Sequence, residues 1–590
     1  MDILSLVTVL SFSIGCLADQ RPNIVVIVAD DLGYNDVSFH GSNQIPTPNI
    51  DALAYSGIIL NNYYVSPICT PTRGALMSGR HPIHTGLQHS VIFASEKYGL
   101  PLKEKIMPQW FKDLGYRTHM VGKKYGLPLE EKIMPEWFKD LGYRTHMIGK
   151  WHLGMFADEY LPTYRGFESH YGYYQGCEDY YDHTYEAVPE YWGIDWRRNL
   201  DLIRNETNMY STDLFTQEAV NVINNHNTSE PLFLYLPHQA VHSGNTGGDP
   251  LQAPQHYVDR FLHIKNYHRR LYAGMLAALD DSIGQVVKTL TDKQMMDNTI
   301  IVFTTDNGGP ANGFDANAAN NFPLRGVKAT LWEGGVRGVG FIHSPLLKKQ
   351  RYVSNHMLHV CDWLPTLYSA AGGKVSDLKN LDGVDQWKSL SDNKKGLRTE
   401  MLHNIDPHGN GKAALRVGDY KILVGDVGMA WDDWYPPWQN PTDSDRYHVN
   451  NTVKYGHIKD ISTSQNFNGI TNKEDDSLVY EMNIDNTKSL LKQSMESYNH
   501  NGLPVKVDCG IKPANASTNC DPRVSPCLYN IALDPCEYNN IADSNKDIVI
   551  EMMVKLMQYG NTAVPPLNTP VDPAGNPKYH NGAWVPWVKL

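Results

Sequence analysis

Short runs of apolar residues, rich in valine and isoleucine, recur along the first part of the chain. The clearest are residues 23–31 (NIVVIVADD), 231–236 (PLFLYL) and 298–307 (NTIIVFTTDN). The apolar residues in these runs are continuous and do not alternate with polar ones. This pattern is typical of parallel strands that are buried on both faces of a sheet.

Helical patterns lie between these runs. In residues 131–142 (EKIMPEWFKDLG), Ile133, Trp137 and Leu141 recur at helical spacing and Gly142 provides a stop. Strands that alternate with helices in this way predict an α/β fold, with a sheet covered by helices on both faces.

The composition changes after about residue 410, where the chain becomes rich in Asn, Asp and Gly and carries only scattered short strand patterns. We therefore expect a large domain over residues 19–410 and a smaller C-terminal α+β domain over residues 411–590. A chain of 590 residues exceeds one ordinary hydrophobic core, which agrees with two domains.

The N-terminus has the pattern of a signal peptide over residues 1–18. An apolar run over residues 3–17 is followed by Ala18 and a polar pair; a buried first helix is the alternative. N-glycosylation sequons begin at Asn205, Asn227, Asn450 and Asn515. These features predict entry into the secretory pathway, with a lysosomal or extracellular destination.

The charge pattern excludes two classes of partner. The net charge is −12 and the Lys and Arg residues are spread along the chain, so the sequence gives no electrostatic footprint for binding nucleic acid or anionic membranes. No later apolar run reaches the length of a membrane span.

The eight cysteines fall into separate groups. Cys16 lies in the expected signal peptide, and Cys177 and Cys361 stand apart. The four that crowd into 28 residues are Cys509, Cys520, Cys527 and Cys536. Such a cluster predicts disulfides formed in an oxidising compartment. Zinc binding is the alternative, but no C-x-x-C pair is present.

A 27-residue segment is repeated in tandem, at residues 97–123 and 124–150. The copies differ only at Lys103/Glu130, Gln109/Glu136 and Val121/Ile148. Two copies do not make a solenoid, because a solenoid needs three or more units to bury a continuous face. A duplicated exon, or a gene model that joins two alternative exons, is the simpler explanation.

Only one copy of the repeat is expected to fit the sheet. Lys123 and Lys150 are equivalent, but only Lys150 is followed by Trp151 and His152. We therefore assign Lys150 and His152 to the site. The first copy has an equally apolar face, through Ile106, Trp110 and Leu114, and we expect it to pack peripherally or to remain exposed.

Polar residues follow the predicted strands at their carboxyl ends, where open α/β sheets bind ligands. They are Asp30 and Asp31, Asp306 and Asn307, His238 and His242, and Lys150 and His152. Three carboxylates and an amide that converge from two strands form an all-oxygen site. Such a site suits a hard divalent cation, calcium or magnesium, rather than zinc.

Residues 66–86 (SPICTPTRGALMSGRHPIHTG) carry the most specific motif. The core, Cys69-Thr70-Pro71-Thr72-Arg73, resembles the C-x-P-x-R sequence that the formylglycine-generating enzyme recognises in sulfatases. Residues 142–154 (GYRTHMIGKWHLG) are similar to the second signature of that family. Further matches lie in 306–309 (DNGG), 324–341, 361–367 (CDWLPTL) and 402–407 (LHNIDP).

The chain therefore resembles the sulfatases, in the branch of arylsulfatase B and its I and J relatives. The resemblance implies an alkaline-phosphatase-like fold with a large, mostly parallel mixed sheet, in which residues 19–410 form the catalytic domain. It also implies that Cys69 is converted to formylglycine. One hydroxyl of the hydrated aldehyde would attack sulfur, and the other would later expel sulfate as the aldehyde re-forms.

The resemblance implies a role for each matched residue. One calcium ion per chain, with magnesium the less expected cation, would be bound by Asp30, Asp31, Asp306, Asn307 and the hydrated residue 69. Arg73 and Lys150 would hold the gem-diol, Asp306 would assist the attacking hydroxyl, and His152 would accept the second hydroxyl proton. His242 and Lys328 would bind the sulfate and stabilise the departing alcohol. His238 lies close by in sequence, but the motif favours His242.

The implied substrates are sulfated sugars of the N-acetylgalactosamine 4-sulfate type, or small sulfated glycosides such as glucosinolates. The formylglycine-generating enzyme is an implied partner during maturation. Two other functions stay open at this stage. One is a phosphodiesterase or phosphonate hydrolase of the same superfamily, and the other is a secreted binding protein whose catalysis the repeat has impaired.

Overall fold

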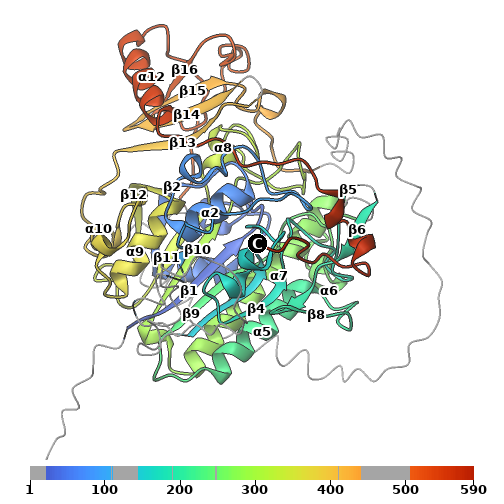
Figure 1. Cartoon of the computed structure of the whole chain (residues 1–590). Helices are drawn as coiled ribbons and strands as arrows, with labels where there is room; N and C mark the ends of the chain where they lie inside the picture. Colours follow the sequence, from blue (N-terminus) through green and yellow to red (C-terminus); the bar gives the residue numbers. More distant parts are fainter. Residues whose placement is uncertain are drawn as a thin grey trace, which may run out of the picture.

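The computed structural model describes residues 21–107, 109, 114, 144–188, 190–245, 249–408, 411–439 and 505–590. The expected signal peptide, the helical pattern at 131–142 and the sequon at Asn450 lie outside these residues. In the described part, a large unit of sheet and helices carries a smaller sheet with its own helix (Figure 1). The sequon residues Asn205, Asn227 and Asn515 are all exposed.

The large unit is built on a ten-stranded sheet with the order β12-β2-β11-β10-β1-β9-β3-β4-β7-β8. Its strands are β1 (Asn23–Ala29), β2 (Ile58–Tyr64), β3 (Arg144–Lys150), β4 (Ser169–Tyr173), β7 (Arg197–Arg198), β8 (Asp201–Leu202), β9 (Leu232–Pro237), β10 (Thr299–Thr305), β11 (Gly340–His343) and β12 (Tyr352–His359). The central strands β10, β1, β9, β3 and β4 run parallel, whereas β11, β7 and β8 are antiparallel to their neighbours. The prediction of a mixed, mostly parallel sheet is confirmed.

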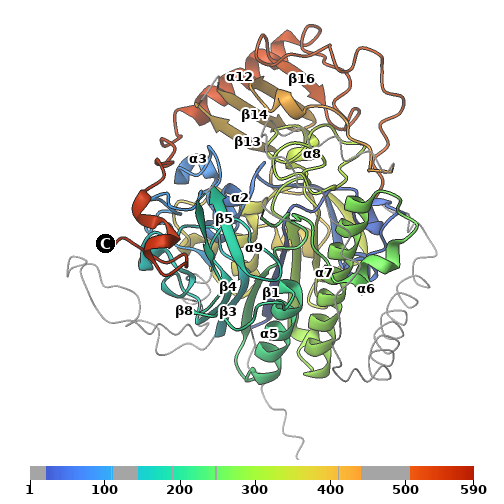
Figure 2. The same ribbon diagram turned by 90° about the vertical axis from the view of Figure 1, so that its right-hand side faces the viewer.

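Both faces of the sheet are covered, as the apolar runs predict. In β1, Val25 and Ile27 point into one core and Ile24 and Val26 into the other. The first core includes α1 (Pro48–Ser56), α5 (Ser211–Asn225) and α7 (Tyr267–Asp292), and the second includes α2 (Cys69–Ser78) and α9 (Trp363–Ala370) (Figure 2). Each fully buried Val or Ile stabilises the fold by about 1.5–3 kcal/mol. The buried apolar residues of β1 therefore contribute strongly to the stability of both cores.

Short elements complete the large unit. They are the helices α3 (Pro82–Thr85), α6 (Gln255–Val258), α8 (Glu333–Val336) and α10 (Trp387–Ser391), and the paired strands β5 (Thr184–Val188) and β6 (Tyr191–Ile194). The end of the chain returns to this unit, where Trp584 is fully buried in the core that contains α2.

The smaller unit is an antiparallel sheet with one helix. Its strands are β13 (Glu400–Asp406), β14 (Lys412–Val417), β15 (Tyr420–Gly425) and β16 (Cys527–Asn530), and α12 (Lys546–Gly560) covers one face. The other face packs against Trp332 and Val336 of the large unit. The prediction of a smaller C-terminal α+β region is confirmed, and its first strand begins before the composition change near residue 411.

The cysteine cluster forms disulfides, as predicted. Cys509 is bonded to Cys536, and Cys520 is bonded to Cys527. Among the described residues, Cys69, Cys177 and Cys361 carry free thiols. The strand β16 begins at Cys527, so the second disulfide ties a loop directly to the smaller sheet.

The tandem repeat contributes to the core from both of its copies. Ile106 and Met107 of the first copy are fully buried in the core that contains α2. Leu100 donates its amide hydrogen to the Leu153 carbonyl oxygen (3.0 Å), and Arg165 donates to the Leu100 carbonyl oxygen (2.9 Å). The second copy supplies β3.

The expectation that the first copy packs peripherally is therefore wrong for its described part. The near-identical copies compete for one place in the fold, and chain connectivity decides between them. The position after Glu96 is filled by the copy that follows it directly, and the strand before Trp151 is filled by the copy that precedes it. Trp110, Trp137 and Leu141 lie outside the described residues.

Deleting residues 97–123 should leave a protein that is at least as stable and as active as the full chain. The remaining copy supplies the same buried residues, and Glu136 replaces Gln109, whose Oε1 accepts a hydrogen bond from the Ile106 amide (2.7 Å). A glutamate carboxylate accepts the same bond. The measurement compares the thermal midpoint and the rate of 4-nitrocatechol sulfate hydrolysis between the two forms.

Deleting residues 124–150 instead is the matched control, because the two deletions leave chains that differ at only three positions. Both deletions should behave alike. Unfolding or loss of activity in both shortened forms would show that the fold needs both copies.

Candidate active site

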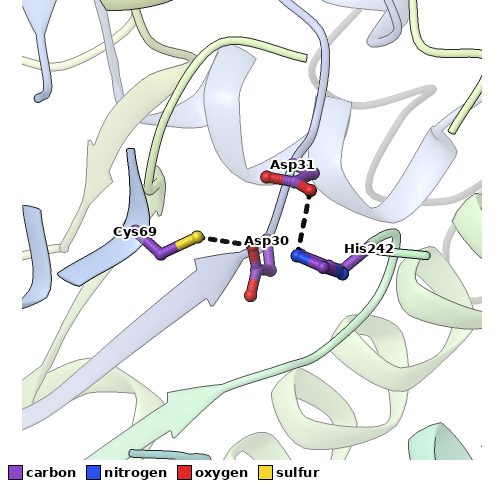
Figure 3. A group of neighbouring side chains, drawn as sticks. All are labelled: Asp30, Asp31, Cys69 and His242. Atoms are coloured by element: carbon purple, nitrogen blue, oxygen red, sulfur yellow. Dashed lines mark hydrogen bonds and ion pairs between the residues drawn. The ribbon is translucent and has the colours of Figure 1, made fainter. Parts of the chain in front are cut away.

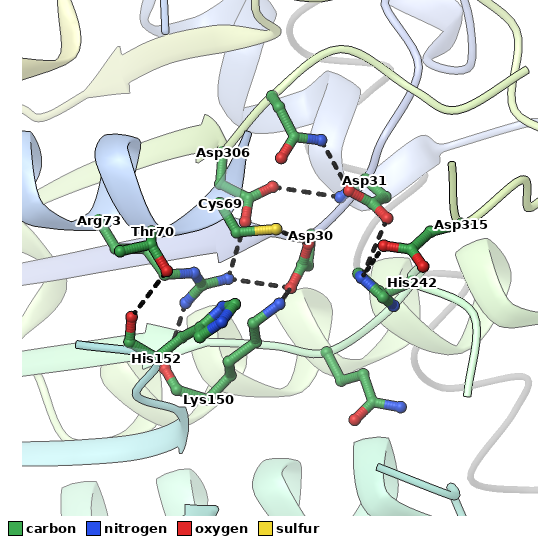
Figure 4. Close-up of polar contacts among 12 residues, drawn as sticks. Asp30, Asp31, Cys69, Thr70, Arg73, Lys150, His152, His242, Asp306 and Asp315 are labelled. Carbon is green, nitrogen blue, oxygen red and sulfur yellow. Dashed lines mark hydrogen bonds and ion pairs between the residues drawn. The ribbon is translucent and has the colours of Figure 1, made fainter. Parts of the chain in front are cut away.

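The polar residues that follow the central strands meet at one edge of the sheet (Figure 4). Asp30 and Asp31 follow β1, Asp306 follows β10, and Lys150 ends β3. Lys150 forms a buried ion pair with Asp30 across the intervening strand β9. The Asp31 amide donates to Asp306 Oδ1 (3.2 Å). Three parallel strands, β10, β1 and β3, therefore deliver the side chains at their ends to the same point.

Two glycines allow the backbone to approach closely around this point. Gly149 in β3 has φ +124°, and a Cβ atom there would lie 2.0 Å from the Pro237 carbonyl oxygen of β9. Gly308, directly after Asn307, would place a Cβ atom 1.8 Å from the Gly334 carbonyl oxygen. Any larger residue at either position would displace the strand end that carries the site.

Helix α2 brings the C-x-P-x-R motif to the same point. Cys69 is its first residue, and Pro71 lies in the first turn, where proline is tolerated because amide hydrogens there have no helical partner. Arg73 lies four residues after Cys69 and so shares its face. The Arg73 guanidinium contacts Asp30 (3.1 Å) and Asp306 (3.0 Å) and donates to the Lys150 carbonyl oxygen (3.1 Å).

The ligand atoms of Asp30, Asp31, Cys69 and His242 lie within 4.8 Å of one another (Figure 3). Asn307 joins this group, since its amide nitrogen donates to Asp31 Oδ1 (2.6 Å). Its Oδ1 atom is buried and has no hydrogen-bond partner among the described residues. An unpartnered amide oxygen beside buried carboxylates is the environment that a hard cation prefers.

Burial raises the pKa of Asp306 above its ordinary value, and the nearby charge of Asp30 raises it further, while Arg73 opposes both effects. Gathered carboxylates of this kind repel one another in a buried site, and a divalent cation removes that repulsion. The residues present therefore fit a calcium or magnesium ion.

His242 lies at the edge of this group rather than within the oxygen set. Its Nε2 atom is 3.3 Å from Asp31 Oδ2 and 3.1 Å from the Lys328 ammonium. A ring nitrogen beside an ammonium group is a poor ligand for a second cation. Lys328 also contacts Asp31 (2.8 Å), so His242 and Lys328 together form a cationic wall beside the carboxylates.

The two histidines of the site have opposite electrostatic environments. Burial lowers the pKa of His152 well below its ordinary value, and the charges of Lys150 and Arg73 lower it further. Burial would also lower the pKa of His242, but the charges of Asp31 and Asp30 oppose burial, and the pKa is raised well above the ordinary value. These surroundings favour the neutral form of His152 and the charged form of His242.

His152 has the hydrogen-bond pattern of a base. Its Nε2 atom donates to the Ile92 carbonyl oxygen (3.0 Å), so Nδ1 carries the lone pair of the neutral ring. Nδ1 is buried and has no partner among the described residues. The residue has φ +57°, a strained conformation for a non-glycine residue that is common at functional sites.

The structure gathers Asp30, Asp31, Cys69, Arg73, Lys150, His152, His242, Asp306, Asn307 and Lys328 in one buried group. His238 is elsewhere, since its Nε2 atom contacts Ser282 (3.3 Å) on α7. Two further residues contact this group and were not predicted as site residues. Thr70 donates to the His152 carbonyl oxygen (3.2 Å), and Asp315 forms an ion pair with Lys328 (2.9 Å).

A protein-family model described as sulfatase matches residues 22–132 and 125–373. The two matches overlap within the tandem repeat, which agrees with one copy being additional to the family fold. Among the described residues, no helix combines the length and apolar character needed to cross a membrane.

Several known proteins are similar to the chain. Mouse arylsulfatase J is 34% identical over 98% of this chain and 82% of its own length. Mouse N-acetylgalactosamine-6-sulfatase is 28% identical over 71% of this chain and 74% of its own length. Among solved structures, Ps i-CgsB superposes with a TM-score of 0.65 and 26% identity, over 93% of this chain and 94% of that one. Ps i-CgsB has also been solved in complex with k-i-k-neocarrahexaose.

Proposed function

The chain belongs to the sulfatase family and is a sulfuric ester hydrolase, and we propose that it acts through a formylglycine made from Cys69 beside a bound calcium ion. The observation that carries this proposal is the place of Cys69. Its Sγ atom lies 3.9 Å from Asp30 at the start of α2, in a group that contains several acidic and several basic side chains. A structural cysteine has no need of such surroundings.

Asp30, Asp31, Asp306 and Asn307 would hold the calcium ion, which when bound supplies positive charge to the reacting oxygens. A formylglycine hydrate at position 69 supplies two hydroxyl groups on one carbon, one to attack sulfur and one to release sulfate. The N-terminus of α2 has no side-chain cap, so its dipole also favours negative charge at residue 69.

Arg73 and Lys150 orient residue 69 and stabilise negative charge on its oxygen atoms. Both are fully buried, and Asp30 contacts both of them, so their side chains are fixed before substrate binds. Asp306 accepts the proton of the attacking hydroxyl. His152, neutral and with Nδ1 unpartnered, accepts the proton of the second hydroxyl when sulfate leaves.

His242 and Lys328 bind the sulfate group and assist the leaving alcohol. Burial lowers the pKa of both groups, but the charges of Asp31 and Asp30 oppose it and both pKa values are raised, which favours the charged forms. A sulfate ester is anionic and repels nucleophiles, so a cationic wall on this side is required for attack. The leaving alkoxide then takes its proton from one of these two groups.

We propose sulfated sugars as substrates, of the N-acetylgalactosamine 4-sulfate type or small sulfated glycosides. Support comes from the relatives, which include an N-acetylgalactosamine-6-sulfatase and a structure bound to an oligosaccharide. The exposed sequons and the disulfides support maturation in the secretory pathway, where the formylglycine-generating enzyme would act, and a lysosomal or extracellular destination.

The purified protein should hydrolyse 4-nitrocatechol sulfate in calcium buffer. The same preparation should hydrolyse bis(4-nitrophenyl) phosphate far more slowly, because a phosphodiesterase is the alternative within this fold. A preparation that is folded and metal-loaded but prefers the phosphate diester would overturn the proposal, and one that hydrolyses neither ester would favour a binding protein.

A further inference from the structure

Asp315 is the most solvent-accessible charged group of the site. Its side chain is 24% exposed, whereas those of Asp31, Lys328 and His242 are 0–4% exposed. Its Oδ2 atom contacts the Lys328 ammonium (2.9 Å) and His242 Nε2 (3.5 Å). Among the described residues, nothing is hydrogen-bonded to its Oδ1 atom. One oxygen of this carboxylate therefore has no hydrogen-bond partner in the described part of the chain, whereas the other faces His242 (Figure 4).

Charge balance alone does not account for this carboxylate. Lys328 already has a buried counterion, Asp31, at 2.8 Å. A second carboxylate on the same ammonium lowers the positive potential exactly where an anionic sulfate group has to bind, so it weakens substrate binding unless the substrate offers it a hydrogen-bond donor. Sugars offer hydroxyl groups on the carbon atoms next to a sulfate ester, and simple aryl sulfates do not.

The loop that carries Asp315 is held in a fixed conformation. Asn317 donates to the carbonyl oxygens of Val241 (2.8 Å) and Asp31 (3.3 Å), which ties the loop to the ends of β9 and β1. Gly313 has φ +78° and lies against the ring of Trp431, with 2.5 Å between a Cβ atom built there and the indole. Asp315 itself has φ +56°. A strained residue in a braced loop is pre-organised for contact with a ligand.

We propose that Asp315 is a specificity-determining residue, whose carboxylate accepts a hydrogen bond from the sugar hydroxyl next to the sulfate ester. This inference rests on the proposed sulfatase activity and names the substrate feature that the site selects. Lys328 and His242 bind the sulfate group, and Asp315 binds the hydroxyl group on the neighbouring carbon atom. The centre of the Phe314 phenyl ring lies 5.4 Å from the Lys328 ammonium, beside these groups.

The test uses three substrates: methyl N-acetylgalactosaminide 4-sulfate, its 3-deoxy counterpart and 4-nitrophenyl sulfate. Asp315→Ala should lower kcat/KM for the first substrate by about 10- to 100-fold, as expected for loss of a hydrogen bond to a charged group. It should not lower kcat/KM for the other two, because removing the carboxylate raises the positive potential where the sulfate group binds. Asp315→Asn keeps an acceptor oxygen without the charge and should lie between wild type and Asp315→Ala.

Asp377→Asn, which changes an exposed carboxylate away from these groups, is the control, and thermal midpoints show whether each variant is folded. An equal loss on all three substrates would overturn the inference and make Asp315 a positioning residue for Lys328. The inference would also be overturned if the wild-type protein hydrolyses 4-nitrophenyl sulfate but shows the same kcat/KM for the sugar 4-sulfate as for its 3-deoxy counterpart. Wild-type protein that hydrolyses none of them would instead refute the proposed function.

Discussion

Replacing Cys69 by alanine should lower the rate of 4-nitrocatechol sulfate hydrolysis by roughly four orders of magnitude or more, as expected for removal of a nucleophile from its catalytic group. The variant should remain folded, because Cys69 is buried at the start of a helix and alanine removes one atom. Cys69→Ser should also fail to turn over, since a single hydroxyl can attack sulfur but cannot release sulfate by elimination.

Cys361→Ala is the matched control, because Cys361 is a buried free cysteine, as Cys69 is, but lies outside the motif. It should keep wild-type activity. Full activity in Cys69→Ala, with a normal thermal midpoint, would show that the nucleophile is a different group.

Replacing Asp31 by alanine should abolish metal binding and lower the rate by roughly a thousandfold or more, because the carboxylate supplies charge to the cation and the cation stabilises the reacting oxygens. Asp31 also contacts Asn307, His242 and Lys328, so its loss disturbs both the proposed cation site and the cationic groups beside it. Calcium at a hundred times its dissociation constant should stabilise the wild type by about 2.7 kcal/mol and the variant by nothing measurable.

The measurements are metal content by emission spectroscopy, thermal midpoint with and without calcium, and rate. Asp259→Ala, at an exposed carboxylate, is the control and should behave as the wild type does. Stoichiometric zinc in the isolated protein, with activity that depends on it, would contradict the oxygen-rich site.

The sequence predicts the centre of the fold well, because the apolar runs that identify the strands are also the segments that pair at the centre of the sheet. Residues 23–31 and 298–307 have continuous apolar centres and end in polar residues, and β1 and β10 are neighbouring parallel strands. Parallel neighbours end at the same edge, so Asp30 and Asp306 are brought together by topology alone. The four-residue spacing of Cys69 and Arg73 then places both on one face of α2.

Other parts depend on contacts that no local pattern records. Asp315 lies in a polar loop whose conformation is fixed by Asn317 and by Trp431. Trp431 belongs to the smaller unit and lies more than a hundred residues later in the sequence. The repeat failed as a prediction for a different reason. Its copies are nearly identical, so the pattern cannot say which one is buried, and the structure takes Ile106 from the first and β3 from the second.

The most direct test is the mass of the tryptic peptide that ends at Arg73, from protein made in cells that contain the formylglycine-generating enzyme. The account predicts that residue 69 is lighter than cysteine, or has the mass of the aldehyde hydrate, and reacts with carbonyl reagents. The converted fraction should rise and fall with the specific activity of the preparation. A fully active preparation whose residue 69 is an unmodified, alkylatable thiol would contradict the account.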